Sequence, residues 1–250
     1  AREKAGIVKA DSLLVLGERD DDLAQIFIDR APRAVVRRDV DFGVRDNALA
    51  VGGRLLELYT PRAAYADVVL PLHGAHQADN AAIALMAAEG FVNGTLDPEV
   101  VADAFSRVRS PGRLEVVRRQ PLVLLDGAHN VAGAEALRAS LDEAFATGPR
   151  TLVVGLLREK EPHEMLAALG LDDVSLLIVC RAPSPRALEP EAVAKAAIDL
   201  GFAGDRIELA ETVPEAVTNA LLETPEDGQI VITGSLYVVG AARGLLVRGS

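Results

Sequence analysis

The sequence contains little cysteine and no run of apolar residues long enough for a membrane. Among 250 residues the one cysteine is Cys180, which excludes an internal disulfide framework and a cysteine-based zinc cluster. A single cysteine also favours a reducing cytoplasm. No apolar run approaches the roughly 20 residues that span a bilayer, and residues 1–4 lead into no stretch typical of a signal peptide. We therefore expect a cytoplasmic protein without membrane association.

Positive charge is also scarce. Lys and Arg number 26 against 37 Asp and Glu, so the formal net charge is −11. Such an acidic chain is a poor non-specific binder of nucleic acid or acidic membranes, although local basic groups can still hold phosphates. Half of the residues are hydrophobic, which is enough for a sizeable core. The length favours one large or two modest domains.

The first half of the chain predicts a mixture of short strands and helices. Two apolar runs flank Gly52 and Gly53, a hairpin signal because both turn positions can require the positive φ that glycine accepts. The alanine-rich stretch 78–89 predicts a buried helix. Asp97, followed by proline and glutamate, predicts the start of a helix that runs to residue 108. Its predicted inward face comprises Val101, Ala104, Phe105 and Val108. The other expected elements are a helix over residues 22–29 and strands over 12–16, 48–51, 54–59 and 68–72.

The second half of the chain has a different pattern of apolar residues. Pro111 and Gly112 mark a turn and a domain boundary, so we expect one domain over residues 1–112 and another over 113–250. Beyond the turn, continuous apolar runs alternate with helical patterns, which argues for an α/β domain with a parallel sheet covered on both faces. The expected strands are 122–125, 151–156, 175–179 and 229–233, and the expected helices are 134–145, 163–169, 191–200 and 214–222. No Gly-x-Gly-x-x-Gly segment follows any of these strands, which disfavours a nicotinamide dehydrogenase.

The sharpest candidate site is the segment Asp126-Gly127-Ala128-His129-Asn130. It follows a predicted strand and precedes a predicted helix. Ligands of open α/β sheets bind beyond the carboxyl ends of the strands, so a carboxylate, an imidazole and an amide are expected at the ligand edge. The alternative is a plain strand-to-helix turn in which Asp126 or Asn130 caps the helix.

A second candidate lies in residues 72–80. His76, Gln77 and Asn80 fall within one helical turn at a strand-to-helix junction, and an amide can offer both a donor and an acceptor to an adenine edge. Helix capping with exposed histidines is the alternative. His73 and His76 have no third ligand at a suitable spacing, so a metal site is not expected here.

Three further segments carry weaker signals. Arg113, on the proline-glycine turn, can reach a phosphate or a ribose, but a lone arginine is more commonly a surface residue. Lys4 beside Glu3 is usually a surface ion pair. Ser235 follows a predicted strand, where backbone N–H groups can bind an anion or the final helix can simply begin. Cys180 is expected to be a buried thiol at a strand end, without a role.

Taken together, these segments resemble one family, the folylpolyglutamate synthase/dihydrofolate synthase family of the Mur ligase superfamily. The resemblance rests on five motifs in the family's order: residues 3–7, 74–80, 111–113, 126–130 and 233–237. It implies an ATP-dependent ligase in which a folate or dihydropteroate carboxylate is phosphorylated and the acyl phosphate is attacked by the amine of L-glutamate. The implied fold is the C-terminal part of an ATPase domain followed by a Rossmann-like domain.

The resemblance also implies roles for individual residues. Asn80, with His76 and Gln77, would bind adenine, and Arg113 would contact the nucleotide phosphates. Asp126 would hold the ribose or help to place His129.

Four more roles follow from the same resemblance. His129 would lie near the phosphates and the incoming amino acid, with Asn130 beside it. Ser235 would lie near the glutamate pocket. Lys4 matches a lysine that is carbamylated in the family, and a carbamate is a carboxylate that can ligate Mg²⁺.

One departure from the family pattern is large. The glycine-rich phosphate loop that ends in Gly-Lys-Ser/Thr does not occur in this sequence, and residues 52–54 do not qualify. We therefore expect that activity needs an N-terminal portion that this sequence does not contain. Two alternatives stay open: a non-catalytic nucleotide- or glutamate-binding remnant or subunit of a split ligase, and a ligase for muramyl precursors.

Overall fold

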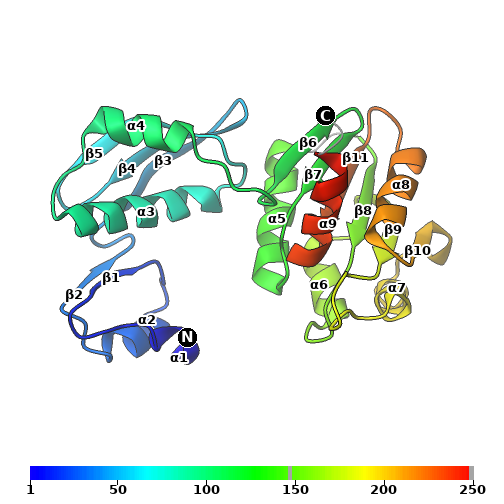
Figure 1. Ribbon diagram of the computed structural model, residues 1–250, viewed down its shortest axis with the longest axis horizontal. Helices are drawn as coiled ribbons and strands as arrows, with labels where there is room; N and C mark the ends of the chain where they lie inside the picture. Colours follow the sequence, from blue (N-terminus) through cyan, green and yellow to red (C-terminus); the bar gives the residue numbers. More distant parts are fainter. Residues whose placement is uncertain (146–147, 248–250) are drawn as a thin grey trace. The chain divides into compact units, whose positions relative to one another are not determined.

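The computed structural model describes residues 1–145 and 148–247 and divides the chain into two compact units, Ala1–Arg109 and Ser110–Ser250 (Figure 1). Each unit is described by itself below, as unit 1 and unit 2. No helix in the part of the chain that the structure describes is both long and apolar enough to cross a membrane.

The described part of unit 2 forms one sheet in the order β10-β9-β8-β11-β7-β6. All neighbours pair in parallel except β6, which runs antiparallel to β7 at the edge. The strands are β6 (Glu115–Arg119), β7 (Leu122–Leu125), β8 (Arg150–Val154), β9 (Val174–Cys180), β10 (Ile207–Ala210) and β11 (Gln229–Thr233). The expected α/β fold with a parallel sheet is confirmed, and the antiparallel edge strand β6 is an addition that we did not predict.

Helices cover both faces of this sheet. The helices are α5 (Val131–Ala144), α6 (Pro162–Leu169), α7 (Pro190–Asp199), α8 (Val213–Glu223) and α9 (Leu236–Leu246), with a short 3₁₀ turn at Gly204–Arg206. One apolar cluster joins the sheet to α5, α6 and α7, and a second joins it to α8 and α9. Successive β7 residues alternate between the clusters, Leu124 in the first and Leu125 in the second, as the period of a strand requires. Cys180 ends β9 as expected, and burial raises the pKa of its thiol to about 12.

The neighbouring parallel strands β7 and β11 lead into helices on opposite faces of the sheet. β7 leads into α5 on the first face, and its neighbour β11 leads into α9 on the second. This is a topological switch point, where adjacent loops diverge and leave a crevice at the carboxyl edge of a parallel sheet. The segments 126–130 and 234–235 lie in these two loops.

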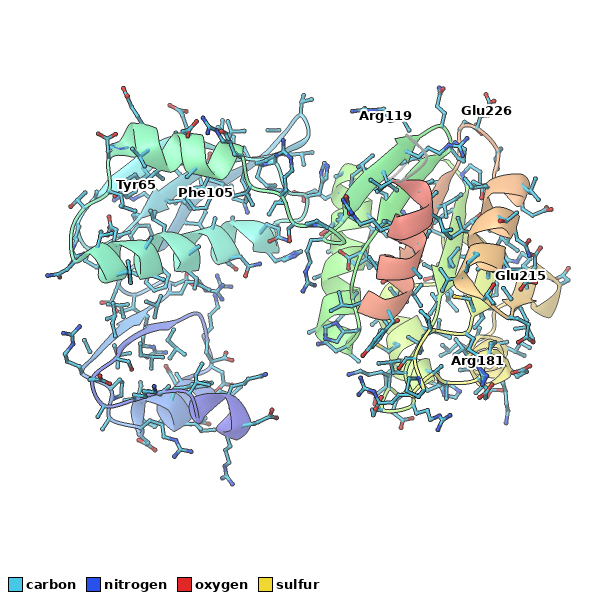
Figure 2. All side chains as sticks on the ribbon, viewed as in Figure 1. Tyr65, Phe105, Arg119, Arg181, Glu215 and Glu226 are labelled. Carbon is cyan, nitrogen blue, oxygen red and sulfur yellow. The ribbon has the colours of Figure 1, made fainter. Side chains whose placement is uncertain are left out.

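Unit 1 contains a three-stranded antiparallel sheet, β3-β4-β5, and a two-stranded parallel sheet, β1-β2. Its strands are β1 (Leu13–Leu16), β2 (Ala34–Arg37), β3 (Gly43–Ala50), β4 (Gly53–Tyr59) and β5 (Ala64–Leu70). Its helices are α1 (Arg2–Ala5), α2 (Asp21–Ile28), α3 (His76–Val92) and α4 (Pro98–Ser106). One apolar cluster supplies the core. Tyr65 belongs to this cluster, and the half-buried Phe105 packs against it (Figure 2).

Local chemistry explains several boundaries in unit 1. Asp97 caps α4 by accepting a hydrogen bond from the Glu99 amide, and Pro98 fills the first turn. The predicted inward face of this helix is wrong at Ala104, which is exposed. Val108 packs against the core as expected, but it lies beyond the end of the helix at Ser106. The hairpin at Gly52 is confirmed. Gly52 has φ +79°, whereas Gly53 does not have positive φ and is glycine because a Cβ would lie 2.1 Å from the Leu70 carbonyl oxygen.

Candidate functional site

The carboxylate of Asp126 organises the loop that follows β7. Its Oδ2 accepts a hydrogen bond from the Leu114 amide at 2.8 Å, and its Oδ1 accepts one from the Ala128 amide at 2.8 Å. One side chain therefore joins the loop after β7 to the turn before β6. Two backbone donors engaged by one carboxylate favour a role in positioning the loops.

Arg113 lies in the turn that Asp126 holds, and we name residues 112–114 the Arg113 turn. The Gly127 amide donates to the Gly112 carbonyl at 2.7 Å. Gly112 has φ +70°, and a Cβ there would lie 2.7 Å from Cγ1 of Val239 in α9. The turn is thus built against both the loop after β7 and helix α9. The Arg113 side chain is exposed, with no hydrogen-bond or ion-pair partner in residues 1–145 and 148–247.

His129 is half-buried and has a defined tautomer. Its Nδ1 lies 2.8 Å from the Gly127 carbonyl oxygen. Because a carbonyl can only accept, Nδ1 carries the hydrogen, and Nε2 is the ring nitrogen left to interact with a ligand. Asn130 caps α5, with Oδ1 accepting from the Gly133 amide at 2.8 Å. The capping alternative is therefore correct for Asn130, and its NH₂ group is left as a donor.

Gly234 and Ser235 bring the loop after β11 to the same place. The Gly234 amide donates to the Ala128 carbonyl at 3.1 Å, and Gly234 has φ +99°. The buried Ser235 caps α9 by accepting from the Val238 amide at 3.2 Å. The structure thus brings together three of the predicted motifs, 111–113, 126–130 and 233–237, at the switch point of unit 2. Helices α5 and α9 both begin there, so the positive ends of their dipoles lie at this edge of the sheet.

The second candidate cluster lies on the first turn of α3 in unit 1. Asn80 Nδ2 donates to Gln77 Oε1 at 3.0 Å, which leaves Asn80 Oδ1 as an acceptor. Gln77 is buried, whereas His76 and Asn80 are exposed and, four residues apart, share a helix face. The pKa of His73, which precedes the helix, is lowered by burial and by the charge of Arg54.

Ion pairs and an amide bridge hold the start of α3. Arg38 Nη1 lies 2.8 Å from Asp79 Oδ2, and the Arg38 side chain is 13% exposed. Buried Arg54 donates through Nε to Asn47 Oδ1 at 2.7 Å, and Asn47 Nδ2 in turn donates to the Ala75 carbonyl at 3.0 Å. Sequence reasoning did not select Arg38, Arg54 or Asn47. The available signal was an arginine directly after or within a run of mostly apolar residues, as Arg38 is after β2 and Arg54 is in β4.

A magnesium site does not fit the described residues alone. Lys4 is exposed on α1, and its side chain has no ion-pair or hydrogen-bond partner in the parts of the chain described here. Across residues 1–145 and 148–247, no group of three or more His, Cys, Asp or Glu side chains gathers closely enough to hold a metal ion. A carbamylated Lys4 would be a single oxygen ligand, and one ligand does not make a magnesium site.

Comparisons with known proteins identify a family for this chain. Residues 112–236 match the family model described as Mur ligase, glutamate ligase domain. The chain is 37% identical to the dihydrofolate synthase/folylpolyglutamate synthase of Mycobacterium tuberculosis, with 99% of this chain and 56% of that protein covered. It is 31% identical to the folylpolyglutamate synthase of Lacticaseibacillus casei, with 100% and 57% covered.

Solved structures show the same similarity. The crystal structures of Mycobacterium tuberculosis folylpolyglutamate synthase complexed with ADP and AMPPCP superpose with a TM-score of 0.88 at 38% identity. The aligned region covers 98% of this chain and 58% of that one. The chain thus spans about half the length of the relatives it matches.

Proposed function

The chain belongs to the folylpolyglutamate synthase/dihydrofolate synthase family of Mur ligases, and from this premise we propose that it forms part of an ATP-dependent ligase. The ligase joins L-glutamate to a folate or dihydropteroate. A carboxylate oxygen attacks the γ-phosphorus of ATP and ADP leaves. The glutamate amine then attacks the acyl carbon, and phosphate leaves as the amide forms. Residues 1–112 belong to the ATPase domain and residues 113–250 to the ligase domain in this proposal.

The observation that carries the proposal is the interlocking of three motifs at one switch point. Gly112 accepts from Gly127, Asp126 accepts from Leu114, and Gly234 donates to Ala128. A site that stabilises moving negative charge needs donors held rigidly before the reaction. Backbone hydrogen bonds between loops supply that rigidity, and Arg113 supplies a guanidinium for phosphate oxygens.

Within this site we assign His129 and Ser235 to the incoming amino acid. Nε2 of His129 is oriented to accept a hydrogen bond or a proton from the amine, because Nδ1 is committed to Gly127. The Ser235 hydroxyl accepts from Val238 and keeps its own hydrogen to donate. Asp126 acts by positioning, and Asn130 offers its NH₂ group to the nucleotide.

In unit 1 we assign the first turn of α3 to the adenine base. Asn80 donates to Gln77, so its Oδ1 is the atom left to accept from the exocyclic amine of adenine. His76, one turn away on the same exposed face, offers a ring for stacking. ATP is thereby proposed as the nucleotide.

The phosphate loop and most ligands for Mg²⁺ are proposed to come from a segment outside these 250 residues. The sequence has no Gly-Lys-Ser/Thr loop, and the described residues lack a metal-binding group of three. No step of the reaction is assigned to the cation. Lys4 is proposed as one carbamylated ligand, and an NMR carbamate signal after addition of isotope-labelled bicarbonate, absent in Lys4→Arg, tests it. A cytoplasmic location stays a prediction from the single cysteine.

The lack of a Gly-Lys-Ser/Thr loop in the sequence and of a metal-binding group of three in the described residues also supports the non-catalytic alternative. A subunit of a split ligase would hold nucleotide or glutamate and depend on another chain for phosphate chemistry. No feature of the described residues favours a ligase for muramyl precursors, and the similarity to folate ligases supports the folate branch instead.

Complementation separates these possibilities. We expect the purified chain to release no ADP in response to folate and glutamate. Mixed with an N-terminal polypeptide that carries a relative's phosphate loop, it should release ADP only when ATP, a folate and L-glutamate are all present. His129→Ala should abolish that release, whereas His163→Ala, an exposed histidine on α6 paired with Asp199, should not. A folded mixture that binds the nucleotide without turnover would favour the non-catalytic subunit.

A further inference from the structure

Glu115, the first residue of β6, has two interactions that the proposed function does not use. Its Oε2 accepts a hydrogen bond from the Gly112 amide at 2.9 Å. Both carboxylate oxygens also lie close to Nε of Arg243 in α9, at 3.1 and 3.0 Å. The Glu115 side chain is 23% exposed and that of Arg243 37%. The ion pair is thus partly shielded from solvent, which makes its geometry more persistent than that of a fully exposed pair.

The conformation of the Arg113 turn needs such support. Gly112 has φ +70° and Leu114 has φ +45°. The left-handed region is unfavourable for a residue with a Cβ, so Leu114 keeps this conformation only because its surroundings impose it. Asp126 holds the Leu114 amide at one end of the turn. Glu115 holds the Gly112 amide at the other, so Arg113 is fixed on both sides while its side chain stays exposed.

We propose that Glu115 and Arg243 are positioning residues for Arg113. Arg243 directs the Glu115 carboxylate, the carboxylate fixes the Gly112 amide, and the turn then presents the Arg113 guanidinium to the nucleotide phosphates. The inference rests on the proposed role of Arg113. Unlike Asp126, Glu115 makes none of its described hydrogen bonds to the segment that carries His129. Its loss should therefore change nucleotide binding more than the chemical step.

The first test follows the turn itself in the 250-residue chain. Amide hydrogen exchange, resolved by NMR, should become at least about tenfold faster at Gly112 in Glu115→Ala, as expected when one hydrogen bond of a carboxylate is lost. Glu115→Gln keeps an acceptor oxygen and should restore most of the protection. Arg243→Ala should give an intermediate effect. Unchanged exchange at Gly112 in Glu115→Ala overturns the proposal.

Two matched controls exclude a general loss of stability. Glu215 in α8 also accepts one backbone amide, that of Glu211 at 3.0 Å, and Arg119 lies at the other end of β6 (Figure 2). Glu215→Ala and Arg119→Ala should leave exchange at Gly112 unchanged. A similar acceleration in either control would assign the effect to global opening and overturn the proposal.

The second test uses the complemented ligase and separates KM from kcat. Arg113→Ala and Glu115→Ala should both raise KM for ATP about tenfold or more, as expected for a lost phosphate contact, with a smaller change in kcat, and Glu115→Gln should restore KM. If Arg113→Ala raises KM and Glu115→Ala does not, the positioning inference is wrong while the proposed function stands. If Arg113→Ala itself leaves KM unchanged, the proposed role of Arg113 fails and the inference fails with it.

Discussion

The two units hold their proposed site residues in different ways. In unit 2, loops from adjacent strands bind one another through backbone groups, as between Gly112 and Gly127 and between Gly234 and Ala128. In unit 1, the start of a single helix is held by side chains, Arg38 with Asp79 and Arg54 through Asn47. A backbone network is sensitive to φ and to steric contact, whereas a side-chain network is sensitive to charge and salt. The following predictions use this difference.

The largest effect is expected from a Cβ in the Arg113 turn. Gly112→Ala adds strain at φ +70° and a Cβ 2.7 Å from Val239, so we expect a loss of about 2–4 kcal/mol in the free energy of unfolding. Gly52→Ala is the matched control in unit 1: its φ is +79°, but nothing lies within 4 Å of the new Cβ. It should lose only about 1 kcal/mol. Urea denaturation measures both, and equal losses would contradict the steric argument.

The next effect concerns Asp126. Asp126→Ala removes the acceptor of two backbone amides and should lower the free energy of unfolding by about 2 kcal/mol. Asp126→Asn keeps one acceptor oxygen and should lose about half as much. Asp103, an exposed residue on α4 that pairs with Arg107, provides the control variant Asp103→Ala. If Asp126→Asn and Asp126→Ala behave alike in urea denaturation, charge rather than hydrogen-bond geometry holds the loop.

A third prediction concerns alkaline pH in unit 1. Burial, with the hydrogen bond from Tyr65 Oη to Glu89 Oε1 at 2.5 Å, raises the pKa of Tyr65 to about 12. Because the pKa of Tyr65 is higher in the folded state, its protonated hydroxyl contributes fully to the free energy of unfolding below the ordinary tyrosine pKa of about 10. That contribution is lost as the pH rises towards 12. Over that pH range we expect the free energy of unfolding to decline by about 1–2 kcal/mol, and this decline should be absent in Tyr65→Phe.

Phenolate absorbance provides an independent measurement of the same group, because the chain has three tyrosines and no tryptophan. One tyrosine should titrate well above the ordinary range, and Tyr65→Phe should remove that component. A Tyr65 that ionises at the ordinary tyrosine pKa of about 10 would contradict the buried hydrogen bond.

The smallest effects are expected at the ion pairs around α3. Arg19 lies 2.6 Å from Asp39 but is 63% exposed, and Asp39, through hydrogen bond and charge, raises the pKa of Arg19. Arg19→Ala should change stability by less than about 0.5 kcal/mol, and Arg38→Ala, which breaks a more buried pair, by about 1 kcal/mol. Both losses should shrink in high salt. An effect of Arg38→Ala that does not depend on salt would show that packing rather than charge fixes the helix.

The sequence predicts the central strands of unit 2 well and the edges poorly. β7 and β11 match their predicted residues because both faces are buried and the runs are continuously apolar. β6 and β10 escaped prediction because these edge strands carry charged residues such as Arg118 and Glu208, which interrupt the apolar pattern. β2 was missed for the same reason, since one of its four residues is the charged Arg37.

The candidate site was likewise predicted in part from the sequence. The rule that ligands bind at the carboxyl ends of strands places His129 and Ser235 at one edge from sequence alone. It does not show that Asp126 accepts from Leu114, nor that Glu115 pairs with Arg243, because those partners are 12 and 128 residues apart. Such contacts depend on the order of strands in the sheet, which periodicity does not contain.

Helix α9 combines three contacts whose spacing has an evolutionary consequence. Ser235 caps the helix, Val239 lies against Gly112, and Arg243 pairs with Glu115, each four residues from the last and therefore on one face. Inserting or deleting a single residue between them would rotate the following contacts by about 100°. Lineages can exchange side chains along this helix one at a time, but a change in its length would separate all the later contacts together. Natural variation in α9 is therefore expected in residue identity and not in residue number.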